Sequence, residues 1–138
     1  MSEKLLLDTA YVQALLNRKD QYHQKAKELL TEIRSAPIVL ITEAVILEIG
    51  NALCAVEHRN AAARYIKGCY ENADRNVQVV PISTDLIRRS LDLFEDRNDK
   101  DWSLTDCISF RVMEDNEIRQ AATADDHFRQ AGFGALMS

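Results

Sequence analysis

Short apolar runs alternate along the chain with longer segments in which apolar residues recur every three or four positions. The runs predict buried strands at residues 5–7, 38–41, 77–80 and, with a weaker pattern, 118–122. The longer segments predict helices over 11–16, 21–34 and 60–74, and others that begin near residues 43, 83 and 103. A short helical turn and an apolar tail follow. Nearly all-apolar strands that alternate with helices are typical of an α/β fold, in which helices cover both faces of a parallel sheet.

Acidic residues follow two of the predicted strands. Asp8 comes directly after the first strand, and Asp125 comes after the fourth, behind Thr123 and Ala124. Functional side chains of such folds gather beyond the carboxyl ends of the strands. If these two strands are neighbours, roughly 5 Å apart, their carboxylates face each other. Asp8 is also explained as the N-cap of the next helix, where Asp is favoured, and the two roles are compatible.

A third carboxylate, Glu48, lies on the apolar face of the helix that begins near residue 43. Its spacing from Ile41, Val45 and Ala52 places all four residues on one side of that helix. A carboxylate on such a face is rarely buried unless it is paired or bound to a metal. Glu43 is explained by the helix dipole instead, so Glu48 is the preferred candidate.

Asp106 is the fourth candidate, and it also has a structural explanation. Ser103-Leu-Thr-Asp106 matches a capping box, in which the acidic side chain serves the start of a helix. Thr123 and Asp126 have the same spacing. This spacing assigns Asp126 to a helix cap and leaves Asp125 without a structural role.

Four motifs, taken together, carry a family resemblance. They are Leu-Leu-Leu-Asp8-Thr9, Val45-Ile-Leu-Glu48-Ile-Gly-Asn51-Ala-Leu53, Ser103-Leu-Thr-Asp106-Cys-Ile-Ser109-Phe110 and Thr123-Ala-Asp125-Asp-His127-Phe128. In order, spacing and flanks they resemble the PIN-domain nucleases, in particular the bacterial VapC-like group, over nearly the whole chain. One departure is Ala10, which stands where a small polar residue is common.

The resemblance implies a three-layer α/β/α PIN-like fold with a short parallel sheet of four to five strands. It implies a Mg²⁺- or Mn²⁺-dependent ribonuclease, often the toxin of a type II toxin–antitoxin pair, with an RNA substrate, a small antitoxin protein as partner and a homodimeric assembly. The acidic quartet of the family falls on Asp8, Glu48, Asp106 and Asp125. The family also has members outside toxin–antitoxin pairs.

The chemistry of these residue types agrees. All-carboxylate sites suit Mg²⁺ or Mn²⁺ and do not suit zinc, and such ions can bind a scissile phosphate and supply a hydroxide for in-line attack. Asp8 and Asp106 are then the most direct ligands, Asp125 completes the shell, and Glu48 holds or activates the water. Asp101 is a candidate auxiliary ligand. Further hydrogen-bond partners behind the ligands are expected to be Thr9 and Asn51.

The charge balance restricts how RNA can bind. The net charge is 17 − 22 = −5, and residues 92–126 alone carry 4 basic against 11 acidic residues, net −7. Such a chain does not bind nucleic acid by overall charge. Arg18 and Lys19, after the first helix, are the candidate RNA-binding residues. Tyr11, Tyr65 and Trp102 are candidates to stack on bases, while helical spacing makes Tyr65 equally a candidate for the core or for a dimer contact.

Two other classes of protein fit this sequence less well than a nuclease does. A phosphotransfer domain also has an Asp after its first strand, but one type needs a second Asp where Ala10 stands and another needs an acidic pair at that strand end. A non-catalytic PIN-fold module that binds RNA or protein predicts a broken quartet, whereas all four acidic positions are filled here.

Length and apolar content describe one domain over residues 1–138. With 46% hydrophobic residues the chain can bury a core of its own. No run approaches the roughly 20 apolar residues of a membrane span, and the N-terminal apolar run is too short for a signal peptide. Three separated cysteines, Cys54, Cys69 and Cys107, are expected to be reduced thiols in the core. A cytoplasmic protein without membrane contact is expected.

Overall fold

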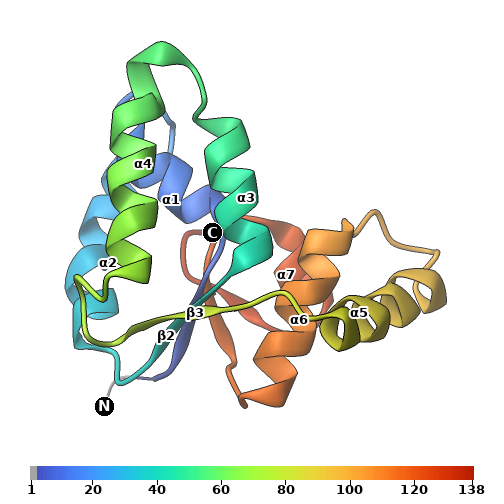
Figure 1. Ribbon diagram of the computed structural model, residues 1–138. Helices are drawn as coiled ribbons and strands as arrows, with labels where there is room; N and C mark the ends of the chain where they lie inside the picture. The colour runs from blue at the N-terminus through green and yellow to red at the C-terminus, as the bar shows by residue number, and fades with distance from the viewer. Residues whose placement is uncertain (1–2) are drawn as a thin grey trace.

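Five parallel strands form one sheet in the computed structural model, which describes residues 3–138. The strand order is β3-β2-β1-β4-β5 (Figure 1). The strands are β1 (Leu5–Leu7), β2 (Val39–Thr42), β3 (Val77–Val80), β4 (Gln120–Ala122) and β5 (Gly134–Ala135). The predicted parallel sheet is confirmed. The apolar tail adds β5, a strand too short to produce a pattern in the sequence.

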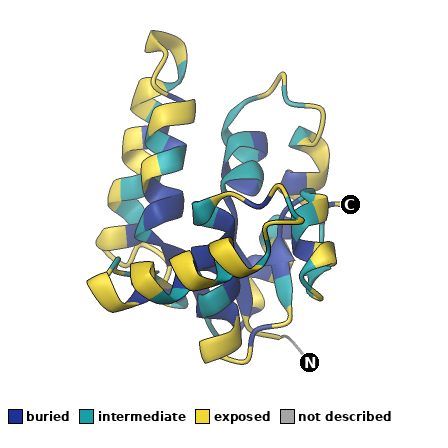
Figure 2. Cartoon of the chain, turned by 90° about the vertical axis from the view of Figure 1, so that its right-hand side faces the viewer, coloured by how far each residue is buried: buried dark blue, intermediate teal, exposed yellow. Residues whose placement is uncertain are grey.

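Helices cover both faces of the sheet, so the predicted three-layer α/β/α arrangement is also confirmed (Figure 1). One face carries α1 (Thr9–Leu16), α2 (His23–Ser35), α3 (Glu43–Ala52) and α4 (Val56–Tyr70). The other carries α5 (Thr84–Asp96), α6 (Leu104–Asp115) and α7 (Asp126–Gln130). Figure 2 shows buried residues along the inner sides of the helices and exposed residues along their outer sides.

The central strand explains why the two faces are separate cores. Side chains alternate along a strand, so Leu5 and Leu7 pack with α1–α4 while Leu6 packs with α5–α7. All three leucines are completely buried. A strand that is covered on both sides has no polar face, which is why residues 5–7 are uniformly apolar.

Three helices begin with a side-chain cap from the Ser or Thr that precedes them. Thr42, Ser83 and Ser103 each accept a hydrogen bond from the backbone N–H of the third residue of the next helix. Helix α4 begins at Val56, four residues before the predicted start. Its N-cap residue, Ala55, makes no side-chain cap, so the sequence contains no start signal there.

Two predictions about side chains in the core are wrong. Tyr11 and Trp102 are almost fully buried, and Trp102 stacks edge-on against Phe110 and donates to Gln130, so neither can stack on a base. Cys54 is exposed instead of buried, while Cys69 and Cys107 lie in the core; all three are free thiols. Within residues 3–138, no helix has the length and apolar character needed to cross a membrane.

Candidate active site

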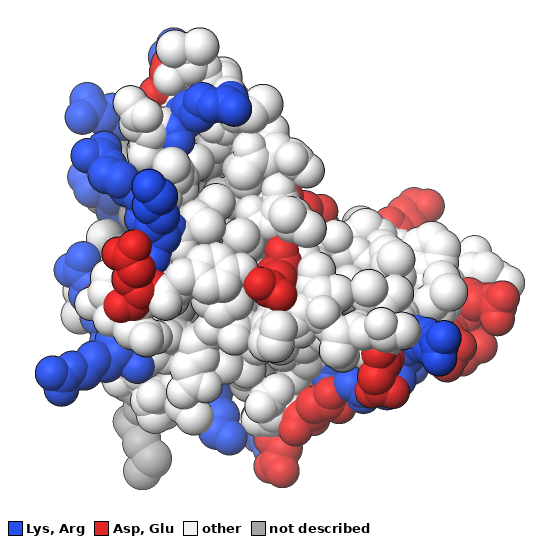
Figure 3. Space-filling model, viewed as in Figure 1, with Lys and Arg blue, Asp and Glu red and all other residues white. Residues whose placement is uncertain are grey.

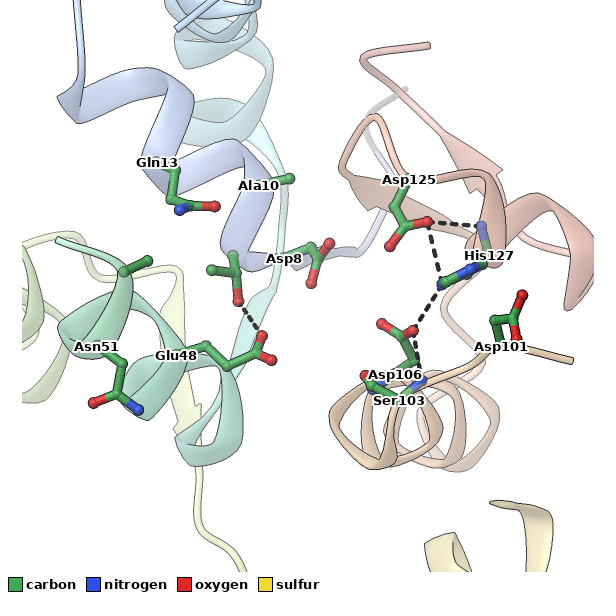
Figure 4. Close-up of a pocket in the computed structure, with 12 residues that line it drawn as sticks. Asp8, Ala10, Gln13, Glu48, Asn51, Asp101, Ser103, Asp106, Asp125 and His127 are labelled. Carbon is green, nitrogen blue, oxygen red and sulfur yellow. Dashed lines mark hydrogen bonds and ion pairs between the residues drawn. The ribbon is translucent and has the colours of Figure 1, made fainter. Parts of the chain in front are cut away.

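The strand order brings the candidate carboxylates to one edge of the sheet. β1 pairs with both β2 and β4, so the residues that follow β1 and β4 are neighbours, which is the condition under which Asp8 and Asp125 were expected to face each other. There they meet the first turn of α6 and one face of α3 around an open pocket of about 710 Å³ (Figure 4). The pocket is lined by Asp8, Thr9, Ala10, Gln13, Glu48, Asn51, Ala52, Asp101, Ser103, Asp106, Asp125 and His127.

The carboxylates come from two sides, which we call the β1–α3 wall (Asp8 and Glu48) and the α6–α7 wall (Asp106, Asp125 and His127). In Figure 4 the side chains of both walls point into the space between them. All four predicted acidic residues therefore line one pocket.

Asp8 stands at the N-cap position of α1 but does not cap it. Its side chain makes no capping hydrogen bond, and Oδ2 instead accepts from the Thr123 hydroxyl at 2.8 Å. Burial raises the pKa of Asp8 to about 7; hydrogen bonds from Thr123 and the Thr9 backbone lower it, and the charges of Asp106 and Asp125 raise it further. Asp8 is only 6% exposed. Capping thus does not explain this residue.

Glu48 is half-buried and is held by a single hydroxyl. The Thr9 side chain donates to Glu48 Oε1 at 2.6 Å, which orients the carboxylate toward the pocket (Figure 4). Asn51, the other expected partner, is exposed on the same pocket and makes no hydrogen bond to Glu48 among the described residues. Glu43 lies outside the pocket, where it accepts from the Tyr70 hydroxyl and the Ile82 backbone N–H.

Asp106 combines both roles that the sequence allowed. It forms the capping box of α6: Ser103 Oγ accepts from the Asp106 N–H, and Asp106 Oδ2 accepts from the Ser103 N–H, both at 3.0 Å. The same carboxylate lines the pocket. A helix cap and a site residue are therefore not alternatives here.

The spacing of Thr123 and Asp126 predicted the wrong member of the Asp125–Asp126 pair as the helix cap. Asp125, not Asp126, is the N-cap of α7, and its Oδ1 accepts from the His127 N–H at 2.9 Å. Thr123 contributes by accepting from the Asp125 N–H at 3.1 Å. Asp126 is the first helical residue, exposed and outside the pocket. The residue left for the site is still Asp125, although it does have a structural role.

His127 is the site residue that the sequence analysis missed. Its Nδ1 lies 2.9 Å from Asp106 Oδ2 and 3.4 Å from Asp125 Oδ1 (Figure 4). Each of these three residues offers a ligand atom, and the atoms lie within 4.8 Å of one another. The available signal was its position two residues after Asp125 in the same motif.

The three remaining candidates, Asp101, Arg18 and Lys19, lie outside this group. Asp101 is exposed and lines the pocket, but it is not one of the three clustered ligands. Arg18 and Lys19 are exposed beyond the far end of α1, a helix roughly 12 Å long, and line a separate depression beside Glu57. These two basic residues therefore do not line the acidic pocket.

The charges of the pocket are unbalanced. Of the residues described, none that lines it is Lys or Arg, while five lining residues are acidic. Carboxylates that converge without a fixed cation repel one another, which fits a site for a bound cation. Oxygen ligands of this kind, with one imidazole beside them, suit Mg²⁺ or Mn²⁺. The donors that could hold the ion are Asp8, Glu48, Asp106 and Asp125.

Comparison with known proteins identifies the family. The model of the PIN domain matches residues 5–134. The chain belongs to the PIN domain family. Among solved structures, VapC20 of Mycobacterium tuberculosis, described as a toxin that cleaves the sarcin–ricin loop, is similar with a TM-score of 0.82 and 26% identity. That similarity covers 94% of this chain and 95% of VapC20. A comparison with curated protein sequences finds no match.

Within this family, the five-stranded order and the seven helices described over residues 3–138 correspond to the PIN fold of VapC proteins. The resemblance drawn from four short motifs is thus confirmed for family and fold. The pocket lies where that fold gathers the ends of β1 and β4, and the match extends across every element that lines it.

Proposed function

We propose that this protein is a divalent-metal-dependent endoribonuclease, a hydrolase of RNA phosphodiester bonds, and that it is the toxin of a type II toxin–antitoxin pair. The supporting observation is the convergence of Asp8, Glu48, Asp106 and Asp125 on one pocket of a PIN-family chain, with no Lys or Arg among the described residues that line it. Similarity to VapC20, a toxin that cleaves an RNA loop, supports RNA as the substrate class.

The side chains of the pocket divide the work. Asp8, Asp106 and Asp125 would hold Mg²⁺ or Mn²⁺, which supplies charge for the scissile phosphate and acidifies a water when bound. Glu48, fixed by the Thr9 hydroxyl, would orient the attacking water and accept its proton. Asp8 contributes a carboxylate whose charge is suppressed by burial until a cation balances it. The protein thus contributes position and charge, and the reaction needs no covalent nucleophile.

Attraction of RNA has to come from outside the acidic pocket. In Figure 3 basic side chains gather over α2 and α4, whereas acidic ones gather over α5. These basic residues are Lys25, Lys27 and Arg34 on α2, and Arg59, Arg64 and Lys67 on α4. Arg18 and Lys19, exposed beyond α1, remain candidate contacts for a part of the RNA distant from the cleaved bond. We expect RNA to lie from the basic side toward the pocket.

The further expectations concern partners. A small antitoxin protein and a homodimeric assembly follow from the likeness to a VapC toxin and are part of this proposal. The alternative, a PIN-fold module that binds RNA or protein without cutting, is disfavoured because every acidic position of the quartet is filled and faces the pocket.

The test is cleavage of RNA by the purified protein with Mg²⁺, with Mn²⁺ and with EDTA. We expect fragments with either metal and none with EDTA. Asp106→Asn from the same preparation excludes a contaminating nuclease, because a contaminant stays active in that sample. Activity that survives EDTA or that requires zinc contradicts the metal assignment. Growth arrest on expression, relieved by the product of an adjacent gene, tests the toxin assignment.

A further inference from the structure

His127 joins two helix starts that each carry a carboxylate of the pocket. Its backbone N–H donates to Asp125 Oδ1 at 2.9 Å, and its ring Nδ1 lies 2.9 Å from Asp106 Oδ2. Asp125 is the N-cap of α7, and Asp106 belongs to the capping box of α6. One residue is thus bonded to both carboxylates of the α6–α7 wall.

The ring contact defines which nitrogen carries hydrogen. An ionised carboxylate can only accept hydrogen bonds, so Nδ1 must be the donor to Asp106. In a neutral imidazole this leaves Nε2 without hydrogen. A ring held in this way resembles the arrangement in which a partner behind the ligands orients a metal-binding group.

The contacts also divide the carboxylate oxygens into two sets. Oδ2 of Asp106 accepts from the Ser103 N–H and from His127, and Oδ1 of Asp125 accepts from the His127 N–H. Among residues 3–138, the other oxygen of each carboxylate has no hydrogen-bond partner. The engaged oxygens hold the side chains in place, and the remaining two are available to a cation.

We infer that His127 is a positioning residue of the site: by donating from Nδ1 and from its backbone it orients Asp106 and Asp125 so that each offers one oxygen to the metal. This rests on the proposed function for the presence of the metal. The inferred role of His127 depends on the N–H at the δ position of its side chain and not on Nε2. Among the described residues the β1–α3 wall has no equivalent, since its carboxylates accept from threonine groups and from no histidine.

Substitutions that keep one nitrogen position at a time provide the test. His127→Asn keeps an N–H at the δ position, His127→Gln places one near the ε position, and His127→Ala removes both. The control is His58→Ala, because the His58 side chain on α4 is similarly exposed (26% against 29%) and lies outside the pocket. Mn²⁺ affinity of the full chain is measured by electron paramagnetic resonance of the free ion, and folding by circular dichroism.

We expect His127→Ala and His127→Gln to bind Mn²⁺ at least about tenfold more weakly than wild type, and His127→Asn to recover binding to within about threefold. His58→Ala should bind as wild type does. Rescue by Gln and not by Asn would show that the ring ligates the metal through Nε2, and would overturn the positioning role. Equal affinity in all variants would overturn it as well.

A second measurement keeps this inference separate from the proposed function. In metal-free protein at about pH 9, above the ordinary pKa of imidazole, nitrogen NMR reports the tautomer of the ring. We expect hydrogen on Nδ1 in wild type and a mixture in Asp106→Ala. Hydrogen on Nε2 in wild type would overturn the inference whether or not metal binds. A wild-type protein that has the expected tautomer but binds no Mn²⁺ would overturn the metal role of His127 together with the metal-dependent nuclease.

Discussion

The two walls of the pocket hold their carboxylates by different means. On the α6–α7 wall, Asp106 and Asp125 each accept a capping hydrogen bond from the backbone at the start of a helix, and both lie beside His127. On the β1–α3 wall, Asp8 and Glu48 each accept a hydrogen bond from one threonine hydroxyl and cap nothing. The first pair therefore supports the fold as well as the site, whereas the second pair has only the site to explain it.

Electrostatics sharpens the difference. Helix N-termini stabilise negative charge, so the carboxylates of the α6–α7 wall are partly compensated in the folded protein. Asp8 also stands at a helix N-terminus but makes no capping hydrogen bond there, and its burial raises its pKa to about 7. Loss of negative charge should therefore destabilise one wall and stabilise the other, although either loss is expected to stop the proposed RNA cleavage.

The largest expected effect is on activity. We expect Asp8→Asn and Asp106→Asn each to lower the rate of RNA cleavage at least about 100-fold, because each removes a charged oxygen that would hold the metal. Initial rates on one RNA with saturating Mn²⁺ measure this. Equal losses on both walls are consistent with one metal site shared between them.

Matched controls come from the neighbouring acids outside the pocket. Asp126→Asn and Glu43→Gln should stay within about tenfold of wild type, because neither side chain reaches the pocket. An inactive Asp126→Asn together with an active Asp125→Asn would show that the wrong member of the pair has been assigned to the site.

The next effect is on the stability of the metal-free protein. The pKa of Asp8 is 3.8 when unfolded and about 7 when folded, so the folded state keeps a proton that the unfolded state releases as the pH rises from about 4 to about 7. The contribution of Asp8 to the free energy of unfolding therefore falls over that window, by up to about 4 kcal/mol, and is constant above it. Asp8→Asn should remove this fall.

Melting in EDTA measures the effect. At about pH 8 we expect Asp8→Asn to melt a few degrees higher than wild type, since about 1 kcal/mol shifts a domain of this size by roughly 3–5 °C. Near pH 4 the two proteins should melt together. A variant that melts lower at both values would mean that Asp8 stabilises the fold and that the two walls do not differ.

Metal binding should reverse the order of stability. A saturating divalent cation stabilises wild type by mass action, about 2.7 kcal/mol at a concentration 100 times the dissociation constant. Asp8→Asn should lose most of this upward shift. Thermal melts of both proteins with and without Mn²⁺ provide the measurement; an undiminished shift in the variant would place the cation away from the β1–α3 wall.

The smallest expected effect is the difference in stability between removing a carboxylate that caps a helix and neutralising one that does not. Asp106→Ala removes half of the capping box of α6 and should lower the free energy of unfolding by about 1 kcal/mol in EDTA. Glu48→Gln, which keeps an acceptor for Thr9, should change it by less than about 0.5 kcal/mol. Urea titration of both variants resolves the difference, and similar values would remove the distinction between the walls.

The sequence by itself determined the kind of fold and the acidic residues to consider. Strands covered on both faces are apolar throughout, and helices repeat apolar residues every three or four positions, so the strands at residues 5–7 and 38–41 and the helices after them could be predicted locally. Features with a weak local signal could not be predicted: β5 has only two residues, and α4 begins without a side-chain cap. The excess of acidic residues in segment 92–126 can be counted in the sequence, but the sequence does not show which of them line the pocket.

Only the tertiary structure decided which side chains meet. Asp8 and Thr123 are separated by 115 positions and touch because β1 pairs with β4, a choice made by the burial of whole layers and not by local preference. The cap of α7 falls on Asp125 because cap geometry depends on backbone angles that spacing does not specify. The contact of the His127 ring with Asp106 also depends on the tertiary structure, because the two residues lie on different helices.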